Sequence, residues 1–194
     1  MRNSLTLALD FYGPLQQSES AARRVGWESD ALHELRLRAL LNGVGPLGRF
    51  GRAIDVGCGE GRLITLLNEA GFKGSYRGED VLPFMVERAK RTFPEKEFAV
   101  MDSFTSDAPD ADLILCSGTL NTLTSDTTLE TLQGTIETLW SRSRKTLALD
   151  FAVRGRHPSG AQLSCFDVTE VLTLARRLSR APFCHIRTTR RAAT

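Results

Sequence analysis

The chain has 194 residues, of which 41% are hydrophobic and 25% are charged, so it can enclose a single core of ordinary composition. A formal net charge of +2 gives no reason to expect nucleic acid as a partner. Four cysteines without a C-x-x-C pair, beside only three histidines, argue against a zinc site and for reduced thiols. No apolar run reaches the length of a membrane span, and the run at residues 5–9 lacks the pattern of a signal peptide. We therefore expect a cytoplasmic protein with no metal and no membrane partner.

The N-terminal part of the chain has a mainly helical pattern. Residues 1–17 are compatible with a short strand or a helix, and residues 18–43 predict helices that precede the first strand. We expect one domain over residues 1–194. Within it, residues 1–45 would form a helical lid or substrate segment, and residues 46–194 would form the core.

The stretch around which the chain is organised, residues 52–63, reads RAIDVGCGEGRL. Its apolar start is short enough for one buried parallel strand, and a helical pattern follows. Between them, Gly57, Gly59 and Gly61 occupy alternate positions. Glycine adopts positive φ and has no Cβ, so the chain can turn tightly there and a ligand can lie against the backbone. Strand, glycine turn and helix together predict the first half of a nucleotide-binding βαβ unit.

The residues of this turn narrow the choice of ligand. The dinucleotide fingerprint G-x-G-x-x-G requires its third glycine at the position of Arg62. Asp55 precedes the first glycine, and Glu60 lies inside the turn. Such an acidic turn is a poor host for a pyrophosphate and suits a ligand with a cationic centre and an ammonium group.

Residues 53–61, AIDVGCGEG, resemble the first motif of the class I S-adenosylmethionine-dependent methyltransferases. Residues 75–80, 98–102 and 111–118 resemble the second, third and fourth strands of that family, in the right order and at the right spacing. The resemblance covers about residues 50–155. It implies an α/β fold with a Rossmann-like, doubly wound, mostly parallel sheet and helices on both faces.

The resemblance also implies S-adenosylmethionine as the cofactor, with an acid at the end of the second strand on the ribose hydroxyls. We favour Asp80 over Glu79, because alternation along a strand points only one of them at the ligand and the Gly78-x-Asp80 spacing fits the family. Asp102, after the third strand, could accept from the adenine amino group. The expected cofactor-binding residues are Asp55, Gly57, Cys58, Gly59, Gly61, Asp80, Val81, Asp102, Ser103, Ser117 and Arg36.

Three residues of the N-terminal segment each have more than one reading. Trp27 could be an apolar lid on the active site or an ordinary packed aromatic. Arg36 could reach the cofactor carboxylate, as an N-terminal arginine does in some relatives, or belong to a solvated helix face. His33 shares a helix face with Arg36 and could be a base, a hydrogen-bond partner or a half-exposed surface residue.

The segment after the fourth strand, residues 116–121, reads CSGTLN, where the family places the methyl group and the acceptor atom. Members that methylate amino groups of nucleobases or glutamine amides often carry N-P-P-Y or D-P-P-Y there. The absence of that motif argues against this subclass.

The C-terminal part predicts a helix at 126–140, a fifth strand at 145–153 and a helix at 168–179. Residues 182–189 could form a sixth strand. The family sheet normally ends in an antiparallel hairpin, which would therefore be shortened or missing. An open sheet edge could pair with a second chain, so a homodimer is conceivable.

We expect transfer of a methyl group from the sulfonium to an oxygen or nitrogen of a small-molecule acceptor. A general base is needed only if the acceptor holds its proton, and the candidates are Asp150, His157 and Asn121. None of them is assigned as catalytic. The alternatives are a non-catalytic cofactor-binding module that acts through a partner, and an RNA methyltransferase, suggested by the arginines near the C-terminus.

Overall fold

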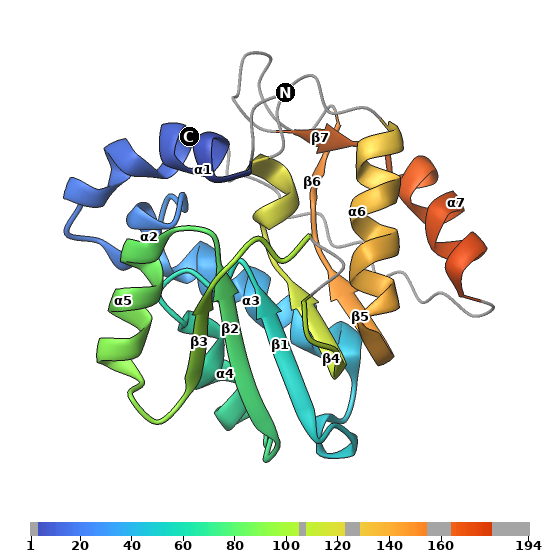
Figure 1. Cartoon of the computed structure of the whole chain (residues 1–194), viewed down its shortest axis with the longest axis horizontal. Helices are drawn as coiled ribbons and strands as arrows, with labels where there is room; N and C mark the ends of the chain where they lie inside the picture. The colour runs from blue at the N-terminus through green and yellow to red at the C-terminus, as the bar shows by residue number, and fades with distance from the viewer. Residues whose placement is uncertain (1–3, 105–107, 123–128, 155–163, 180–194) are drawn as a thin grey trace.

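The computed structural model describes residues 4–104, 108–122, 129–154 and 164–179. Five strands form one sheet in the order β3-β2-β1-β4-β5, and every neighbouring pair is parallel (Figure 1). The strands are β1 (Arg52–Val56), β2 (Ser75–Asp80), β3 (Glu97–Val100), β4 (Ala111–Cys116) and β5 (Ser143–Leu149). The strand order reverses between β1 and β4, and α/β sheets bind their ligands at that point, outside the carboxyl ends of the strands. The expected Rossmann-like fold is confirmed.

Helices cover both faces of this sheet. One core cluster joins α3 (Asp30–Val44), α4 (Arg62–Glu69) and α5 (Pro83–Thr92) to one face, and the other joins α6 (Leu129–Ser141) and α7 (Val168–Leu178) to the opposite face. Alternation along the strands feeds both clusters, since Ala53 packs into the first and Ile54 into the second. None of the helices in the described ranges is long and apolar enough to cross a bilayer.

The N-terminal helices lie along the carboxyl edge of the sheet, where Figure 1 draws α1 in dark blue above the strand ends. They are α1 (Ser4–Tyr12), the 3-10 turn η1 (Gly13–Gln17) and α2 (Ala21–Arg24). The N-terminal segment is therefore helical, which decides between the strand and the helix left open by the sequence. Helix α1 packs against Leu82 and Met85 at the start of α5 through Ala8 and Tyr12. A second 3-10 turn, η2 (Leu47–Arg49), leads into β1.

The C-terminal strands differ from the expectation. The single strand expected at 145–153 is wrong, because β5 ends at Leu149 and β6 (Ala152–Val153) pairs in parallel with β7 (Cys165–Phe166) in a separate small sheet. The break occurs at Asp150, whose side chain is held by Ser117 and Gly118, which follow β4, and by Arg36 of α3. No antiparallel strand pair occurs within the described ranges, and the sixth strand expected at 182–189 lies outside them.

Candidate active site

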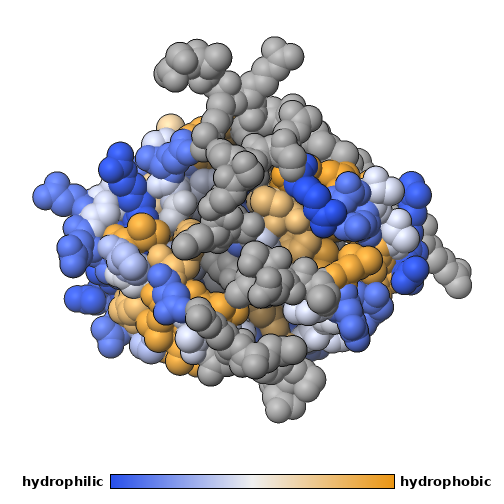
Figure 2. Space-filling view, turned by 90° about the horizontal axis from the view of Figure 1, so that it is seen from above, coloured by the Kyte–Doolittle hydropathy of each residue, from blue (hydrophilic) through white to orange (hydrophobic). Residues whose placement is uncertain are grey.

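A cavity of about 890 Å³ lies at the carboxyl edge of the sheet, between the strand ends and the N-terminal helices. This volume falls in the range of small-molecule and cofactor sites. All the expected cofactor-binding residues line it except Gly61, which instead caps α4. Figure 2 shows the molecule from this side, with hydrophobic residues gathered in the inner part of the face and hydrophilic residues around its rim.

The glycine turn needs glycine for conformation and for space. Gly57 and Gly59 have φ values of +70° and +54°, a region that other residues rarely adopt. A Cβ on Gly57 would lie 2.0 Å from Oγ1 of Thr119, which follows β4. The turn therefore packs directly against the next strand end, and no side chain fits between them.

The N–H groups of the turn are largely used inside the protein. Gly57 and Cys58 donate to the Glu79 carbonyl at 2.7 and 3.0 Å, and Gly59 donates to Asp80 Oδ2 at 2.9 Å. Gly61 donates to the Cys58 carbonyl at 2.9 Å. A phosphate-binding turn directs such groups at its ligand. The structure therefore supports the sequence argument against a pyrophosphate.

The Glu60 side chain, which also lines the cavity, is bound by two arginines. Arg24 binds it with two contacts, Nε to Oε1 at 2.6 Å and Nη2 to Oε2 at 2.7 Å, and Arg88 adds a third at 3.0 Å. Burial raises the pKa of Glu60, but these arginines hold it below its ordinary value overall. Glu60 thus ties α2 and α5 to the glycine turn, and its charge is neutralised by them.

Asp55 is buried directly below the turn. Its Oδ2 accepts a hydrogen bond from the Tyr76 hydroxyl at 2.8 Å, and only 4% of the residue is exposed. Burial raises the pKa of Asp55 to about 7, assisted by the charges of Asp80 and Glu79 and opposed by the Tyr76 hydrogen bond. This carboxyl lines the cavity at its floor.

The two acids at the end of β2 point in different directions. Asp80 lines the cavity and accepts from the N–H groups of Gly59 and Leu82, both at 2.9 Å. Burial raises its pKa although these hydrogen bonds oppose the shift. Glu79 is 0% exposed and pairs with Arg142 at 2.7 Å and Arg77 at 3.0 Å. Asp80 is therefore the acid that a ligand can reach.

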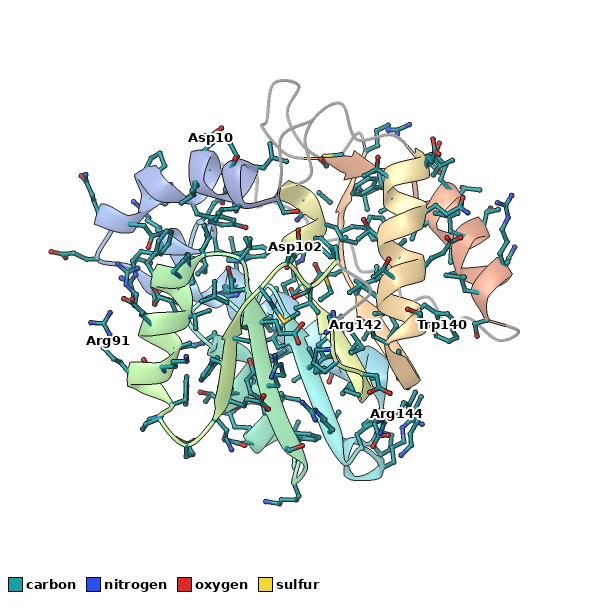
Figure 3. All side chains as sticks on the ribbon, in the orientation of Figure 1. Asp10, Arg91, Asp102, Trp140, Arg142 and Arg144 are labelled. Carbon is teal, nitrogen blue, oxygen red and sulfur yellow. The ribbon has the colours of Figure 1, made fainter. Side chains whose placement is uncertain are left out.

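Arg142 is a site-supporting residue that sequence reasoning missed. Besides Glu79, it donates to the carbonyls of Ser103 at 2.6 Å and Pro109 at 3.0 Å, and so holds the loop that carries Asp102. Figure 3 shows Arg142 inside the molecule, Arg144 at its edge and Asp102 at the carboxyl edge of the sheet. Nothing in the local sequence distinguishes the two arginines.

Asp150 joins the ends of β4 and β5 to α3. Its Oδ1 pairs with Arg36 Nη2 at 2.6 Å and accepts from the Gly118 N–H at 2.9 Å, while its Oδ2 accepts from Ser117 Oγ at 2.6 Å. Arg36 and Ser117 both line the cavity. The aspartate thus orients two of the expected cofactor-binding residues.

Trp27 lies against two residues of α3 on the cavity wall. Its ring stacks on the His33 imidazole, with centroids 5.3 Å apart and planes at 8°, and Arg36 Cζ is 5.1 Å from its centroid. Burial, with the positive charge of Arg62, lowers the pKa of His33 to about 4, so the imidazole is neutral at neutral pH. Both Trp27 and Arg36 therefore line the cavity.

The described base candidates are held by the protein itself. Asn121 is buried, and its Oδ1 accepts from the Ala152 N–H at 2.7 Å. Asp150 already accepts three hydrogen bonds, from Arg36, Ser117 and the Gly118 N–H. His157 lies outside the described residues. No general base is assigned.

Comparison with protein families agrees with this geometry. Residues 53–140, which run from β1 to α6, match the model of a family described as a methyltransferase domain. This segment therefore matches a methyltransferase domain, and the chain has the fold of the class I S-adenosylmethionine-dependent methyltransferases. A search of curated proteins finds no match to this chain.

Solved structures share the fold of this methyltransferase. The N-methyltransferase NodS from Bradyrhizobium japonicum WM9, in complex with S-adenosylhomocysteine, has a TM-score of 0.67 at 18% identity, covering 85% of this chain and 84% of that one. Magnesium protoporphyrin IX methyltransferase from Synechocystis PCC 6803 with bound SAM has a TM-score of 0.63 at 19% identity, covering 92% and 86%. The amino pentose methyltransferase CalS10 from Micromonospora echinaspora has a TM-score of 0.61 at 15% identity, covering 75% and 82%.

The cavity suits the cofactor of the family, S-adenosylmethionine, which carries a positive sulfonium and an ammonium group. The carboxyls of Asp55, Asp80 and Asp102 line its floor. Two arginines also line it, but Arg36 pairs with Asp150 and Arg62 pairs with Glu34 at 2.8 Å. The wall is therefore acidic on balance, as a cationic ligand requires.

Proposed function

We propose that this methyltransferase transfers the methyl group of S-adenosylmethionine to an oxygen or nitrogen of a small molecule. The observation that carries the proposal is the cavity of about 890 Å³, lined by the acids Asp55, Asp80 and Asp102 and by the apolar residues Leu7, Ala8 and Phe11 of α1. Its size suits a cofactor together with a compact acceptor. NodS, an N-methyltransferase, and CalS10, an amino pentose methyltransferase, agree with such an acceptor.

The proposed cofactor contacts follow the strand ends. Asp80 would accept from the ribose hydroxyls, and Asp102, whose Oδ1 accepts from the Phe104 N–H at 3.0 Å, would accept from the adenine amino group. Arg36, oriented by Asp150, would bind the cofactor carboxylate with its remaining N–H groups. The expected lid, residues 1–45, would close the cavity from above.

The cofactor supplies an activated methyl group, so the protein needs mainly to align the reactants and exclude water. Alignment of this kind can lower a barrier by roughly 7–11 kcal/mol. The stacked Trp27 and His33 and the ion-paired Arg36 form a rigid wall for this purpose. Three further points stay predictions: a small-molecule acceptor, a homodimer at the sheet edge and a cytoplasmic location.

Calorimetry with S-adenosylmethionine and S-adenosylhomocysteine tests the cofactor part of the proposal. We expect saturable binding of both ligands by the intact chain, and weaker binding by Asp80→Ala. The absence of saturable binding would reject the proposal.

Transfer of a labelled methyl group to a fraction of small metabolites, and not to RNA or protein, tests the acceptor. No transfer to any fraction would favour the non-catalytic binding module, and transfer to RNA would favour an RNA methyltransferase.

A further inference from the structure

Helix α1 crosses the cavity above the glycine turn. At one side it packs against Leu82 and Met85, which follow the end of β2, and it also contacts η3 (Thr119–Thr122), which follows β4. Because β1 lies between β2 and β4 in the sheet, a helix that touches both flanking ends passes over the end of β1. The side chains of α1 that line the cavity therefore face the turn after β1.

Tyr12, the last residue of α1, is one of these side chains. Its ring lies edge-on to Phe11 with centroids 4.8 Å apart, and a Cβ on Gly26 would lie 3.4 Å from it. Burial raises the pKa of Tyr12, and so do the nearby groups of Asp80, at the end of β2, and Cys116, at the end of β4. Tyr12 packs against Leu82 and Met85 after β2, and its helix also contacts η3 after β4, so the side chain lies in the cavity between these two strand ends. The hydroxyl forms no hydrogen bond with another of the described residues, so it is available to a ligand.

The chemistry of the cofactor relates this position to one atom. In S-adenosylmethionine the sulfur is bonded to the 5′ carbon of the ribose, and adenine is attached at the opposite side of the sugar. If Asp80 holds the ribose and Asp102 lies beside the adenine, as proposed above, the sulfur falls on the other side of Asp80, towards β1 and β4. That is the region occupied by the Tyr12 hydroxyl.

Resting on that proposed function, we infer that the phenol oxygen of Tyr12 contacts the sulfonium centre of S-adenosylmethionine and stabilises its positive charge from the roof of the cavity. The carboxyls of Asp55 and Asp80 lie in the floor below, so the positive group meets negative or partly negative oxygens from both sides. The product, S-adenosylhomocysteine, has a neutral sulfur and gains nothing from this contact. Tyr12 thus favours the substrate form of the cofactor over the product form.

Calorimetry of Tyr12→Phe with both forms of the cofactor tests the inference without any acceptor. We expect the dissociation constant of S-adenosylmethionine to rise about tenfold, as when one polar contact to a charged group is lost, and that of S-adenosylhomocysteine to stay nearly unchanged. Equal weakening for both ligands would place the hydroxyl on a shared part of the cofactor and overturn the inference. If neither dissociation constant changes, the Tyr12 hydroxyl does not contact the cofactor, and the inference is also overturned.

Two controls separate this effect from general damage. Leu9→Ala removes an exposed side chain of the same helix outside the cavity, and we expect it to leave both dissociation constants unchanged. Thermal unfolding of Tyr12→Phe without ligand should match the unmodified chain. If the unmodified chain binds neither ligand, the proposed function itself fails. Binding of both forms with no difference caused by Tyr12→Phe rejects the tyrosine contact alone.

Discussion

Arg142 and Glu79 form an ion pair in the interior, with Nη2 2.7 Å from Oε2 and side-chain exposures of 3% and 0%. The pair connects the start of β5 to the end of β2. The remaining guanidinium donors bind the carbonyls of Ser103 and Pro109, in the segment between β3 and β4. Burying two charges costs free energy that only such complete pairing offsets. The pair therefore holds the carboxyl edge of the sheet in place, and its loss is expected to lower the stability of the fold.

Arg142→Met should lower the free energy of unfolding by about 3–5 kcal/mol, because it leaves the Glu79 carboxylate buried without its main partner. Urea unfolding followed by circular dichroism measures the change. Arg144→Met is the matched control, two positions along the chain. Its pair with Asp110 is exposed, at 61% and 51%, so we expect no measurable change. The double variant Glu79→Gln/Arg142→Met should recover part of the loss, and equal losses in Arg142→Met and Arg144→Met would contradict the assignment.

Asp80→Asn should raise the dissociation constants of S-adenosylmethionine and S-adenosylhomocysteine by similar factors of roughly 10–100, because the ribose hydroxyls are common to both. The equal effect distinguishes Asp80 from Tyr12, whose substitution is expected to affect only the sulfonium form. Calorimetry with both ligands measures the ratio. Asp112→Asn is the control, since Asp112 lies near the start of β4, at the opposite end of that strand from the cavity, and accepts from the Gly51 N–H. Unchanged binding by Asp80→Asn would remove Asp80 from the cofactor site.

The cofactor edge of the sheet could be predicted from the sequence because each strand end carries its own local signal. The turn after β1 shows glycines at alternate positions, Asp80 follows Gly78 at the spacing of the family, and Asp102 follows a short apolar run. In a parallel sheet these ends meet at one edge, so the signals combine without any knowledge of tertiary contacts. All of these residues line the cavity except Gly61.

Features that depend on contacts between distant residues could not be predicted. Glu60 looks like a ligand-facing acid until Arg24 and Arg88, 36 and 28 positions away, are seen to bind it. Tyr12 precedes a Gly-Pro pair that suggests only the end of an element. The end of β5 depends on Asp150 meeting Ser117 from another strand. None of these partnerships leaves a periodic or local pattern in the chain.

The stability of the fold should depend on pH through Asp55. Its pKa of about 7 in the folded chain lies above the ordinary value of 3.8, so the folded state takes up a proton more readily than the unfolded state. The resulting stabilisation is complete below pH about 4 and is lost as the pH rises through about 7. Asp55→Asn removes this dependence. We therefore compare the free energies of unfolding of the variant and of the unmodified chain at each pH. The variant's value minus the unmodified chain's value should increase from pH about 4 to pH about 7, by at most about 1.4 kcal/mol per pH unit. A difference that stays constant from pH 4 to 8 would show that this carboxyl does not titrate there.

Gly57→Ala should both destabilise the chain and abolish cofactor binding. Alanine is disfavoured at φ +70°, and its Cβ would lie 2.0 Å from Thr119 Oγ1, so the turn or η3 must shift. We expect a loss of about 2–4 kcal/mol in the free energy of unfolding. Gly134→Ala is the matched control, because Gly134 lies within α6 with nothing within 4 Å of a built Cβ, and the change should stabilise the helix by about 1 kcal/mol. Urea unfolding and calorimetry with S-adenosylhomocysteine measure both effects. If Gly57→Ala binds the cofactor normally, the turn tolerates a side chain at this position. Glycine would then not be needed there to make room for the cofactor.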